Sequence, residues 1–433
     1  MMLTHKALHP INSKSKLKRH KRTKDRFTNL VNFLCSTTFD YINQKAAFNF
    51  SDAISIPSKI DDSESVLRRS NWNLNDDQRE LLLWHDRLGH IHLKHVQALL
   101  AKPKDGERSE HKHRIIQPSN NKCSHCECQN CLCEACQYAK QKRRKPNSSK
   151  IVALKENKGA LSVDIVHSGQ RVSVDLYVSA VRGRLSESYG KEKTDKQYTG
   201  GAIFVDHKSR LVHHTHQFST TAAETVNSKH NFERFCNSHG VKIKEYVADN
   251  NPFHSVDWKD DCKNQLQEFH YSGVGAHHQN YAERYIQTIF TMARALLLHF
   301  AIHWPQKADA QLWPFAVDHA VYLWNKMPKI DTKLSPLEVF TDTLFHNHHH
   351  LQRLHVFGCP VYVLDPKLQD AKKLPKWERR SRRGIYLGVS KHHSSTVHLV
   401  LNTDTGKVTP QYHVGFDDSF SMTTYGTPWS LPT

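Results

Sequence analysis

Two histidines and two cysteines of this sequence have the types and the spacing of a zinc site. His85 and His90 stand five residues apart, and Cys133 and Cys136 form a C-x-x-C further along the chain. Structural zinc ions take four nitrogen or sulfur ligands in a tetrahedron, which a histidine pair from a helix and a cysteine pair from a turn can supply. Because four protein ligands leave no open position, we predict a structural ion here.

The neighbouring sequence holds further residues of the same types: Cys123, Cys126, Cys128, Cys131, His92 and His95. A second zinc ion, or a different choice of cysteines, is therefore open at this point.

Three acidic residues, Asp175, Asp249 and Glu283, could hold divalent cations. Asp175 lies inside an apolar strand pattern, Asp249 ends a strand pattern, and Glu283 falls early in a helix pattern. A carboxylate in or at the end of a buried strand is costly unless it binds something. Carboxylates from different elements hold pairs of Mg²⁺ ions where a phosphoryl group is transferred to or from a DNA end. An outward-facing strand carboxylate is the alternative for Asp175.

Asp206 also ends a strand pattern. Its neighbours His207, Lys208 and Ser209 are typical of a hairpin turn, so we predict a structural role for this fourth carboxylate.

Composition narrows the class of partner. The 433 residues hold 61 Lys and Arg against 42 Asp and Glu, a formal net charge of +19, and the cationic residues are clustered. This favours a polyanion, nucleic acid above all. Six of ten cysteines crowd into residues 123–136, the basic start resembles no signal peptide, and the longest apolar stretch (295–302) is too short for a bilayer. We expect a reducing, intracellular setting with no membrane partner.

The elements that must position these residues follow from periodicity. Apolar residues recur at helical spacing over 76–99. Strand patterns (171–178, 201–206, 210–214, 241–247) and helix patterns (222–238 capped by Thr220, 279–300, 311–326) follow, which predicts an α+β domain. Short strands at 360–364, 384–388 and 397–401 predict a small β-barrel or sheet.

At this point several motifs together resemble one family, the Copia-type LTR retrotransposon integrases. The motifs are Trp84-His85-x-x-Leu88-Gly89-His90 with Cys133-x-x-Cys136; Val174-Asp175; Phe204-Val205-Asp206; Ala248-Asp249-Asn250; His278-Gln279-Asn280-x-Ala282-Glu283-Arg284; Trp313-Pro314-Phe315; Trp324-Asn325-x-x-Pro328; and His355-Val356-Phe357-Gly358-Cys359 with Arg383-Gly384-x-Tyr386. The match runs from about residue 81 to 420.

The resemblance implies an α+β chain with an RNase H-like mixed sheet flanked by helices, an N-terminal helical HHCC zinc module and a C-terminal small β-barrel. The expected parts are a poorly patterned basic arm (1–75), the zinc-binding pre-integrase module (76–148), the integrase core (160–330) and the barrel (350–420). Asp175, Asp249 and Glu283 are implied as the catalytic ligands of Mg²⁺ (or Mn²⁺), and His85, His90, Cys133 and Cys136 as the Zn²⁺ ligands.

The implied activity is 3′-end processing and strand transfer of element DNA into a double-stranded target, carried out by a homo-oligomer in the nucleus after a possible cytoplasmic particle stage. Two other hypotheses stay open: a non-catalytic nucleic-acid-binding relic, and an RNase H-type nuclease that only hydrolyses.

Two departures from the family pattern bear on activity. Asn251-Pro252 stand where a glycine usually follows Asp-Asn, and the segment between Gln279 and Glu283 is one residue short. A residue deleted within a helix would turn Glu283 by about 100° relative to what precedes it, whereas a deletion in the preceding turn would matter less.

Clustered cations predict salt-dependent, largely sequence-independent contacts with phosphates. The densest clusters are 140–145 and 372–383, and a basic run at 14–22 is either a solvated arm or an import or DNA-contacting segment. In the second cluster, Trp377 could stack on bases or belong to the barrel core. Tyr386, between Ile385 and Leu387, is predicted to be core.

Overall fold

The computed structural model describes residues 74–102, 115–119, 121–126, 133–141, 165–185, 197–249, 253–271, 280–305, 307–345 and 347–421. The basic arm, most of the 140–145 cluster, Cys128, Cys131 and the Asn251-Pro252 departure lie outside these ranges.

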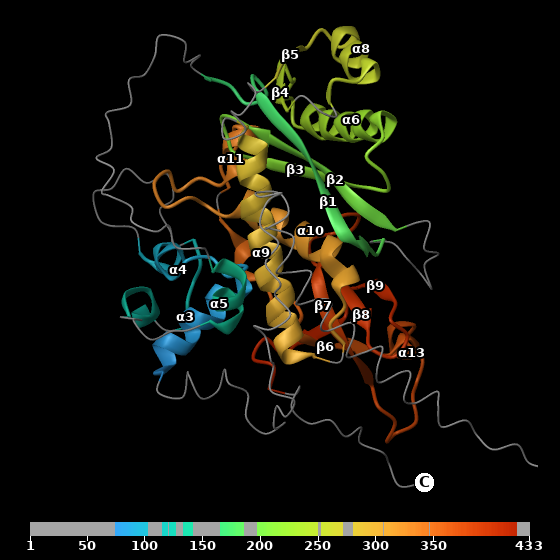
Figure 1. The fold of residues 1–433 in the computed structure, drawn as a ribbon. Helices are drawn as coiled ribbons and strands as arrows, with labels where there is room; N and C mark the ends of the chain where they lie inside the picture. The colour runs from blue at the N-terminus through green and yellow to red at the C-terminus, as the bar shows by residue number, and fades with distance from the viewer. Residues whose placement is uncertain are drawn as a thin grey trace, which may run out of the picture.

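A five-stranded mixed sheet forms the centre of the chain (Figure 1). Its strands are β1 (Val172–Gly183), β2 (Tyr198–Asp206), β3 (Val212–Gln217), β4 (Glu245–Ala248) and β5 (Glu268–Tyr271), in the order β3-β2-β1-β4-β5. The first three strands pair antiparallel, and β4 and β5 run parallel to β1. The mixed α+β architecture predicted from the sequence is confirmed.

Helices cover both faces of this sheet, and the strand pleat assigns each residue to a face. Val172, Val174 and Leu176 of β1 share a core with Tyr246 and Ala248 of β4, beneath the helices α6 (Ala222–Ser238) and α8 (Val256–Asn264). Residues of the opposite face belong to a second core with α9 (Tyr281–His303) and α10 (Trp313–Lys326), which a short 3₁₀ turn (Ala310–Leu312) precedes. Successive strand residues alternate between these two cores.

Close backbone approach explains the glycines of β2. A Cβ on Gly201 would lie 2.2 Å from the Thr215 carbonyl oxygen and 2.3 Å from the Tyr177 hydroxyl, so only glycine fits there.

Four short elements precede the sheet: α3 (Asp76–Arg87), α4 (Leu93–Leu100), a 3₁₀ helix (Asn121–His125) and α5 (Glu134–Lys140). They pack on α9, where Arg294 donates a hydrogen bond to the Ala139 carbonyl at 3.4 Å. Leu81, Val96 and Ala139 thereby join the same core cluster as α9 and α10.

A second five-stranded sheet, entirely antiparallel, closes the described chain. It comprises β6 (Pro360–Leu364), β7 (Ser381–Val389), β8 (His398–Asn402), β9 (Val408–Gln411) and β10 (Val414–Phe416), in the order β10-β6-β7-β8-β9. This order leaves β9 and β10 at the edges, so the predicted sheet is present and barrel closure stays a prediction. Three short helices lie between α10 and β7 in the chain: α11 (Pro336–Thr341), α12 (His349–Gln352) and α13 (Pro366–Gln369). Helix α11 packs on the first sheet's α6 side, where Phe340 lies against Phe235.

Several predicted boundaries were wrong for identifiable reasons. Thr221, rather than Thr220, caps α6, because its hydroxyl accepts the Glu224 amide hydrogen bond. The strand predicted at 241–247 begins only at Glu245, after residues that connect it to α6. The helices α8 and α11 and the strand β5 carry no clear periodicity and were not predicted.

Helix α9 is longer than the apolar stretch singled out from the sequence. Among the described residues it alone is long and apolar enough to cross a membrane, judged by length and composition. Its most apolar window is 61% buried inside the protein, as expected of a core helix.

Charged and polar groups tie the two sheets together. Asp318 of α10 accepts hydrogen bonds from His214 (2.6 Å) and His216 (2.8 Å) of β3 and from Lys391 beyond β7 (2.8 Å). Although burial alone would raise the pKa of Asp318, the neighbouring Lys391 ammonium and the two imidazoles hold it well below its usual range. Trp304 also donates to the Gly358 carbonyl at 2.9 Å, so the second sheet is fixed to the end of α9.

Buried neutral histidines should make the fold sensitive to acid. Burial lowers the pKa of His319 to about 4, and neither of its ring nitrogens has a hydrogen-bond partner. The unfolded chain binds the proton below pH 6.5 and the folded chain does not, so stability falls by about 1.4 kcal/mol per pH unit for this group between those pKa values. When the free energy of unfolding is measured in urea from pH 7 to 4, it should fall less steeply with decreasing pH in His319→Phe, because unfolding of this variant takes up about one proton fewer. The exposed control His254→Phe should not show this change, and an unchanged slope in His319→Phe would contradict the account.

Candidate active site and metal centre

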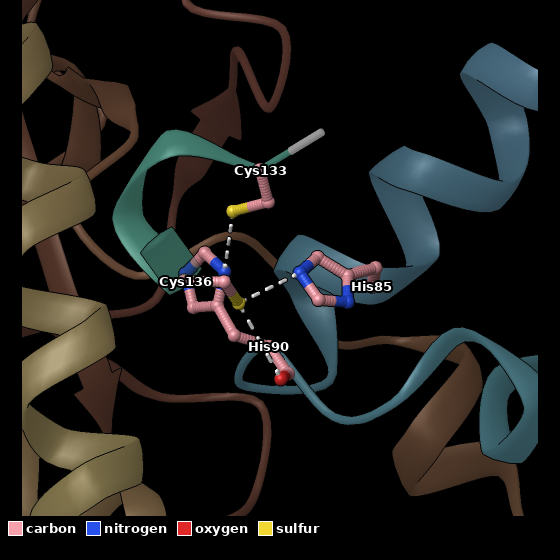
Figure 2. A group of neighbouring side chains, drawn as sticks. All are labelled: His85, His90, Cys133 and Cys136. Atoms are coloured by element: carbon pink, nitrogen blue, oxygen red, sulfur yellow. Dashed lines mark hydrogen bonds between the residues drawn. The ribbon is translucent and has the colours of Figure 1, made fainter. Parts of the chain in front are cut away.

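Four side chains converge at the junction of α3 and α5. One ligand atom from each of His85, His90, Cys133 and Cys136 lies within 4.8 Å of all the others (Figure 2). His85 Nε2 is 3.3 Å from Cys136 Sγ, and His90 Nδ1 is 3.3 Å from Cys133 Sγ. Bond lengths to zinc imply nitrogen–sulfur edges of about 3.5 Å in a tetrahedron, so the group has the dimensions of a zinc site.

The two histidines meet because the chain reverses just after α3. Gly89 and His90 have φ of +70° and +61°, and the His90 amide donates to the His85 carbonyl at 2.8 Å. Glycine is needed in this turn, since a Cβ at position 89 would also lie 2.7 Å from Leu323 of α10. The residues from His85 to His90 therefore span the end of α3 and the left-handed turn that follows it.

The two cysteines are brought together by α5. Cys133 is the N-cap of this helix and Cys136 lies in its first turn, so both thiols stand on one face near the helix N-terminus. A helix N-terminus favours negative charge on a thiol, which is the form that binds metal.

The electrostatics of Cys136 and His90 suit a metal, whereas the pKa values of Cys133 and His85 are raised. The pKa of Cys136 is held far below its usual range, first by the hydrogen bond from Cys133 and then by those from His85 and His90, while the pKa of Cys133 is raised. Burial lowers the pKa of His90 to about 4, which keeps the imidazole neutral. A thiolate and a neutral imidazole are the forms that ligate zinc.

A further observation fits an ion at this position. His85 Nδ1 lies 2.6 Å from the Ile91 carbonyl oxygen, which can only accept, so the ring proton is on Nδ1 and the Nε2 lone pair faces the group.

The described alternatives to this ligand set are engaged elsewhere. His92 accepts the Lys94 amide hydrogen bond that caps α4, and His95 contacts the Pro328 carbonyl at 2.8 Å. Burial raises the pKa of Cys123 to about 12, and Cys126 donates to the Cys123 carbonyl at 3.3 Å.

The sheet register brings two of the predicted carboxylates together. Val174 of β1 pairs with Ala248 of the parallel strand β4, so Asp175 and Asp249 follow on the same row of the sheet. Val174 and Ala248 face the α6 side, and the pleat therefore turns both aspartates toward the face that α9 covers. Asp175 is 7% exposed, and its Oδ1 accepts the Leu176 amide at 2.8 Å.

The third carboxylate comes from the start of α9, which is fixed at the same row. Asn280 caps the helix by accepting the Ala282 amide hydrogen bond, and its own amide donates to the Val174 carbonyl at 3.3 Å. Glu283 is the third residue of the helix. As they stand, however, the oxygens of Asp175, Asp249 and Glu283 do not form a group within 4.8 Å of one another.

The contacts of Tyr281 indicate which way Glu283 leans. The Tyr281 ring stacks on His207 at 4.2 Å between centroids and lies under the Arg210 guanidinium, on the β2–β3 side of β1. Residues two apart on a helix differ by about 200° around its axis, so Glu283 leaves α9 on the side away from Tyr281. Only Tyr281 and Ala282 precede Glu283 within the helix, so any effect of the shortened segment falls at the helix start.

Asp206 has the structural role that its hairpin context predicted. It is fully buried, and its two oxygens accept hydrogen bonds from the Gly169 amide (2.8 Å) and from the amide (2.7 Å) and hydroxyl (2.6 Å) of Ser209. These contacts hold the β2–β3 turn against the start of β1.

Sequence reasoning missed three other groups with metal-ligand geometry: Asp86, His90 and His299; His214, His216 and Asp318; and His230, Glu233 and Asp261. The last two already contain a lysine ammonium, from Lys391 or Lys229, which balances their charge. Each group draws one member from a distant part of the chain, so no local motif could have revealed it.

Comparison with known proteins finds relatives among the proteins of transposons. No protein-family model matches it. It is 32% identical over 152 residues to the Retrovirus-related Pol polyprotein from transposon RE2 of Arabidopsis thaliana, covering 34% of this chain and 9% of that protein. It is 28% identical over 220 residues to the corresponding protein from transposon RE1, covering 50% of this chain and 14% of that protein. The chain is a relative of retrotransposon Pol polyproteins. The predicted resemblance is confirmed, and the chain spans a small part of these relatives.

Solved structures similar to this Pol relative include two viral proteins. One is the HTLV-2 integrase catalytic core domain in complex with magnesium, with 15% identity, 40% of this chain and 98% of that chain covered, and a TM-score of 0.28. The other is a simian T-cell lymphotropic virus intasome in complex with PP2A regulatory subunit B56 gamma, with 12% identity, 59% and 83% coverage, and a TM-score of 0.30. At scores this low, no residue role is transferred from them.

The four-residue group makes a direct prediction for this Pol relative. Purified protein should carry one equivalent of zinc at this group, and Cys136→Ser should lose that equivalent and lower the unfolding temperature by several degrees, because a ligand bound only to the folded state stabilises it. Cys262→Ser, a buried cysteine beside β5, is the matched control and should keep the metal. Zinc content measured by atomic emission, together with the melting temperature, checks both. Full zinc retention in Cys136→Ser would contradict the ligand assignment.

Proposed function

We propose that this chain is the integrase part of a Copia-type retrotransposon Pol polyprotein, with an RNase H-like core that processes DNA 3′ ends and joins them to a target duplex. The observation that carries the proposal is the shared row of Asp175 and Asp249, on the sheet face where Asn280 fixes the start of the Glu283 helix. Carboxylates supplied by separate elements next to one row of a sheet are the donor set that phosphoryl-transfer enzymes use.

The carboxylates fit Mg²⁺ or Mn²⁺ by donor chemistry, since hard cations take Asp and Glu oxygens and keep several waters. Asp175, Asp249 and Glu283 would hold the ions. When bound, such ions activate the attacking oxygen and stabilise the leaving oxygen. Glu283 is half-buried on the first turn of α9, and its oxygens would have to approach those of Asp175 and Asp249 to share ions with them.

The chain's own residues prepare the site. The Leu176 amide orients Asp175, Asn280 ties the α9 start to β1, and Asp206 holds the hairpin beside it. The HHCC group, proposed to bind structural Zn²⁺, packs α5 against the middle of α9, which connects the metal group to the core. We further propose that the chain acts in the nucleus as a homo-oligomer that binds double-stranded DNA. The formal charge of +19 supports a polyanionic partner.

A second function, non-catalytic nucleic-acid binding by a degenerate copy, is favoured by one observation. The three carboxylates are not gathered within 4.8 Å, whereas the four proposed zinc ligands are. The relic would keep the zinc group and the cationic surface but could not close its carboxylates around ions.

Strand transfer separates these functions. A blunt duplex carrying the terminal sequence of the parent element is incubated with the protein, target plasmid and Mg²⁺ or Mn²⁺, and joined products are counted. Asp175→Asn and Glu283→Gln should each lower joining by on the order of 100-fold or more while leaving DNA binding intact, because only the ion ligands change. The exposed acids Asp260 and Glu268 provide matched controls, as Asp260→Asn and Glu268→Gln, that should join normally. Binding without joining or cleavage would establish the relic, and cleavage without joining a hydrolytic nuclease.

A further inference from the structure

One tryptophan, in the connection between β6 and β7 of the second sheet, is exposed to solvent. Trp377 is 81% exposed, whereas the other tryptophans of the described residues are buried or half-buried. Of the two roles that the sequence left open for Trp377, core packing is therefore excluded. Single exposed hydrophobic side chains are common on protein surfaces, so a role for Trp377 must follow from its position and its neighbours.

Backbone geometry places this side chain at a protruding corner. Residues 365–380 connect β6 to β7, and the base of this connection is closed by the Asp365 amide donating to the Arg380 carbonyl at 2.9 Å. At its tip the Glu378 amide donates to the Pro375 carbonyl at 3.1 Å, which makes Lys376 and Trp377 the two central residues of a β-turn. The connection thus presents the indole in a defined position.

Cations surround the indole. From 370 to 383 the chain has seven Lys or Arg residues and two acids, of which Asp370 is paired with Lys372 at 3.4 Å. The Lys376 ammonium lies 5.5 Å from the Trp377 ring centroid, and Lys373, Arg379 and Arg380 are exposed. The face of such an aromatic ring can stack on a nucleic-acid base, while the neighbouring cations contact the phosphates.

The partner must have a base whose face is uncovered. In a duplex, neighbouring bases cover both faces of each base, so an indole stacks on single-stranded nucleotides or on unpaired ends. Membrane binding is less well supported, because the connection exposes no second large apolar side chain within its described residues and a single indole buries little area in a bilayer.

We propose that Trp377 is a stacking platform for an unpaired base, and that the 365–380 connection holds single-stranded DNA next to the duplex on which the core acts. The proposal rests on the proposed function for the identity of the nucleic acid. Stacking would supply selectivity for unpaired DNA, and the surrounding cations would supply affinity common to both forms.

Fluorescence anisotropy with full-length protein tests this, using labelled dT20 and a labelled 20-base-pair duplex at one fixed salt concentration. Trp377→Ala should weaken dT20 binding about tenfold and change duplex binding less than twofold, whereas Trp377→Phe should keep most of the dT20 affinity. Lys376→Ala with Arg379→Ala should weaken both probes. Tyr412→Ala, an aromatic 61% exposed on the same sheet, is the matched control and should change neither.

Equal loss of both probes in Trp377→Ala, or no loss with dT20, would overturn the proposal. Trp377-dependent binding to phosphatidylserine vesicles without selective loss of dT20 would overturn it in favour of a membrane role. Failure of the proposed function has a different signature: no joined products with wild-type protein, while the selective dT20 effect of Trp377→Ala persists.

Discussion

The positions of the carboxylates, the HHCC group and the second sheet depend on one hydrogen bond, which the Asn280 side-chain amide donates to the Val174 carbonyl. It sets the start of α9 against β1, one residue before Asp175, and from there the helix extends past α5 to the second sheet (Figure 1). A single 23-residue helix therefore sets the relative positions of the carboxylates, the HHCC group and the C-terminal sheet. Loss of the Asn280 side chain would remove this bond together with the hydrogen bond that caps α9, and so free the Glu283 turn.

The HHCC group and the carboxylates differ in how far they are already assembled. The zinc-type ligands are held by short local structure, a left-handed turn after α3 and the first turn of α5, whereas Asp175, Asp249 and Glu283 come from elements far apart in the sequence. Carboxylates repel one another when charged, and three of them approach closely only when cations offset that repulsion.

Local signals accounted for most of what sequence could predict. Alternation located β1 and β2, helical spacing located α9 and α10, and the histidine and cysteine spacing identified a group that the fold assembles. Features that depend on tertiary packing escaped: the orientation of Glu283 needed the Tyr281 contacts with His207 and Arg210, and the Asp318 network joins residues about 100 positions apart. The surroundings of two aromatic residues were more informative: Trp377 lies among charged residues in the β6–β7 connection and is 81% exposed, whereas Tyr386 lies between Ile385 and Leu387 in β7 and is fully buried, as its apolar neighbours predicted.

The central claim is that Asp175, Asp249 and Glu283 gather around divalent cations. Anomalous X-ray scattering from crystals grown with Mn²⁺ tests it most directly, since manganese peaks locate the ions independently of any assay. The account predicts peaks between these three carboxylates, absent from crystals of Asp175→Asn. Well-ordered crystals with manganese only elsewhere, for example beside His214, His216 and Asp318, or with no peak at all, would contradict it.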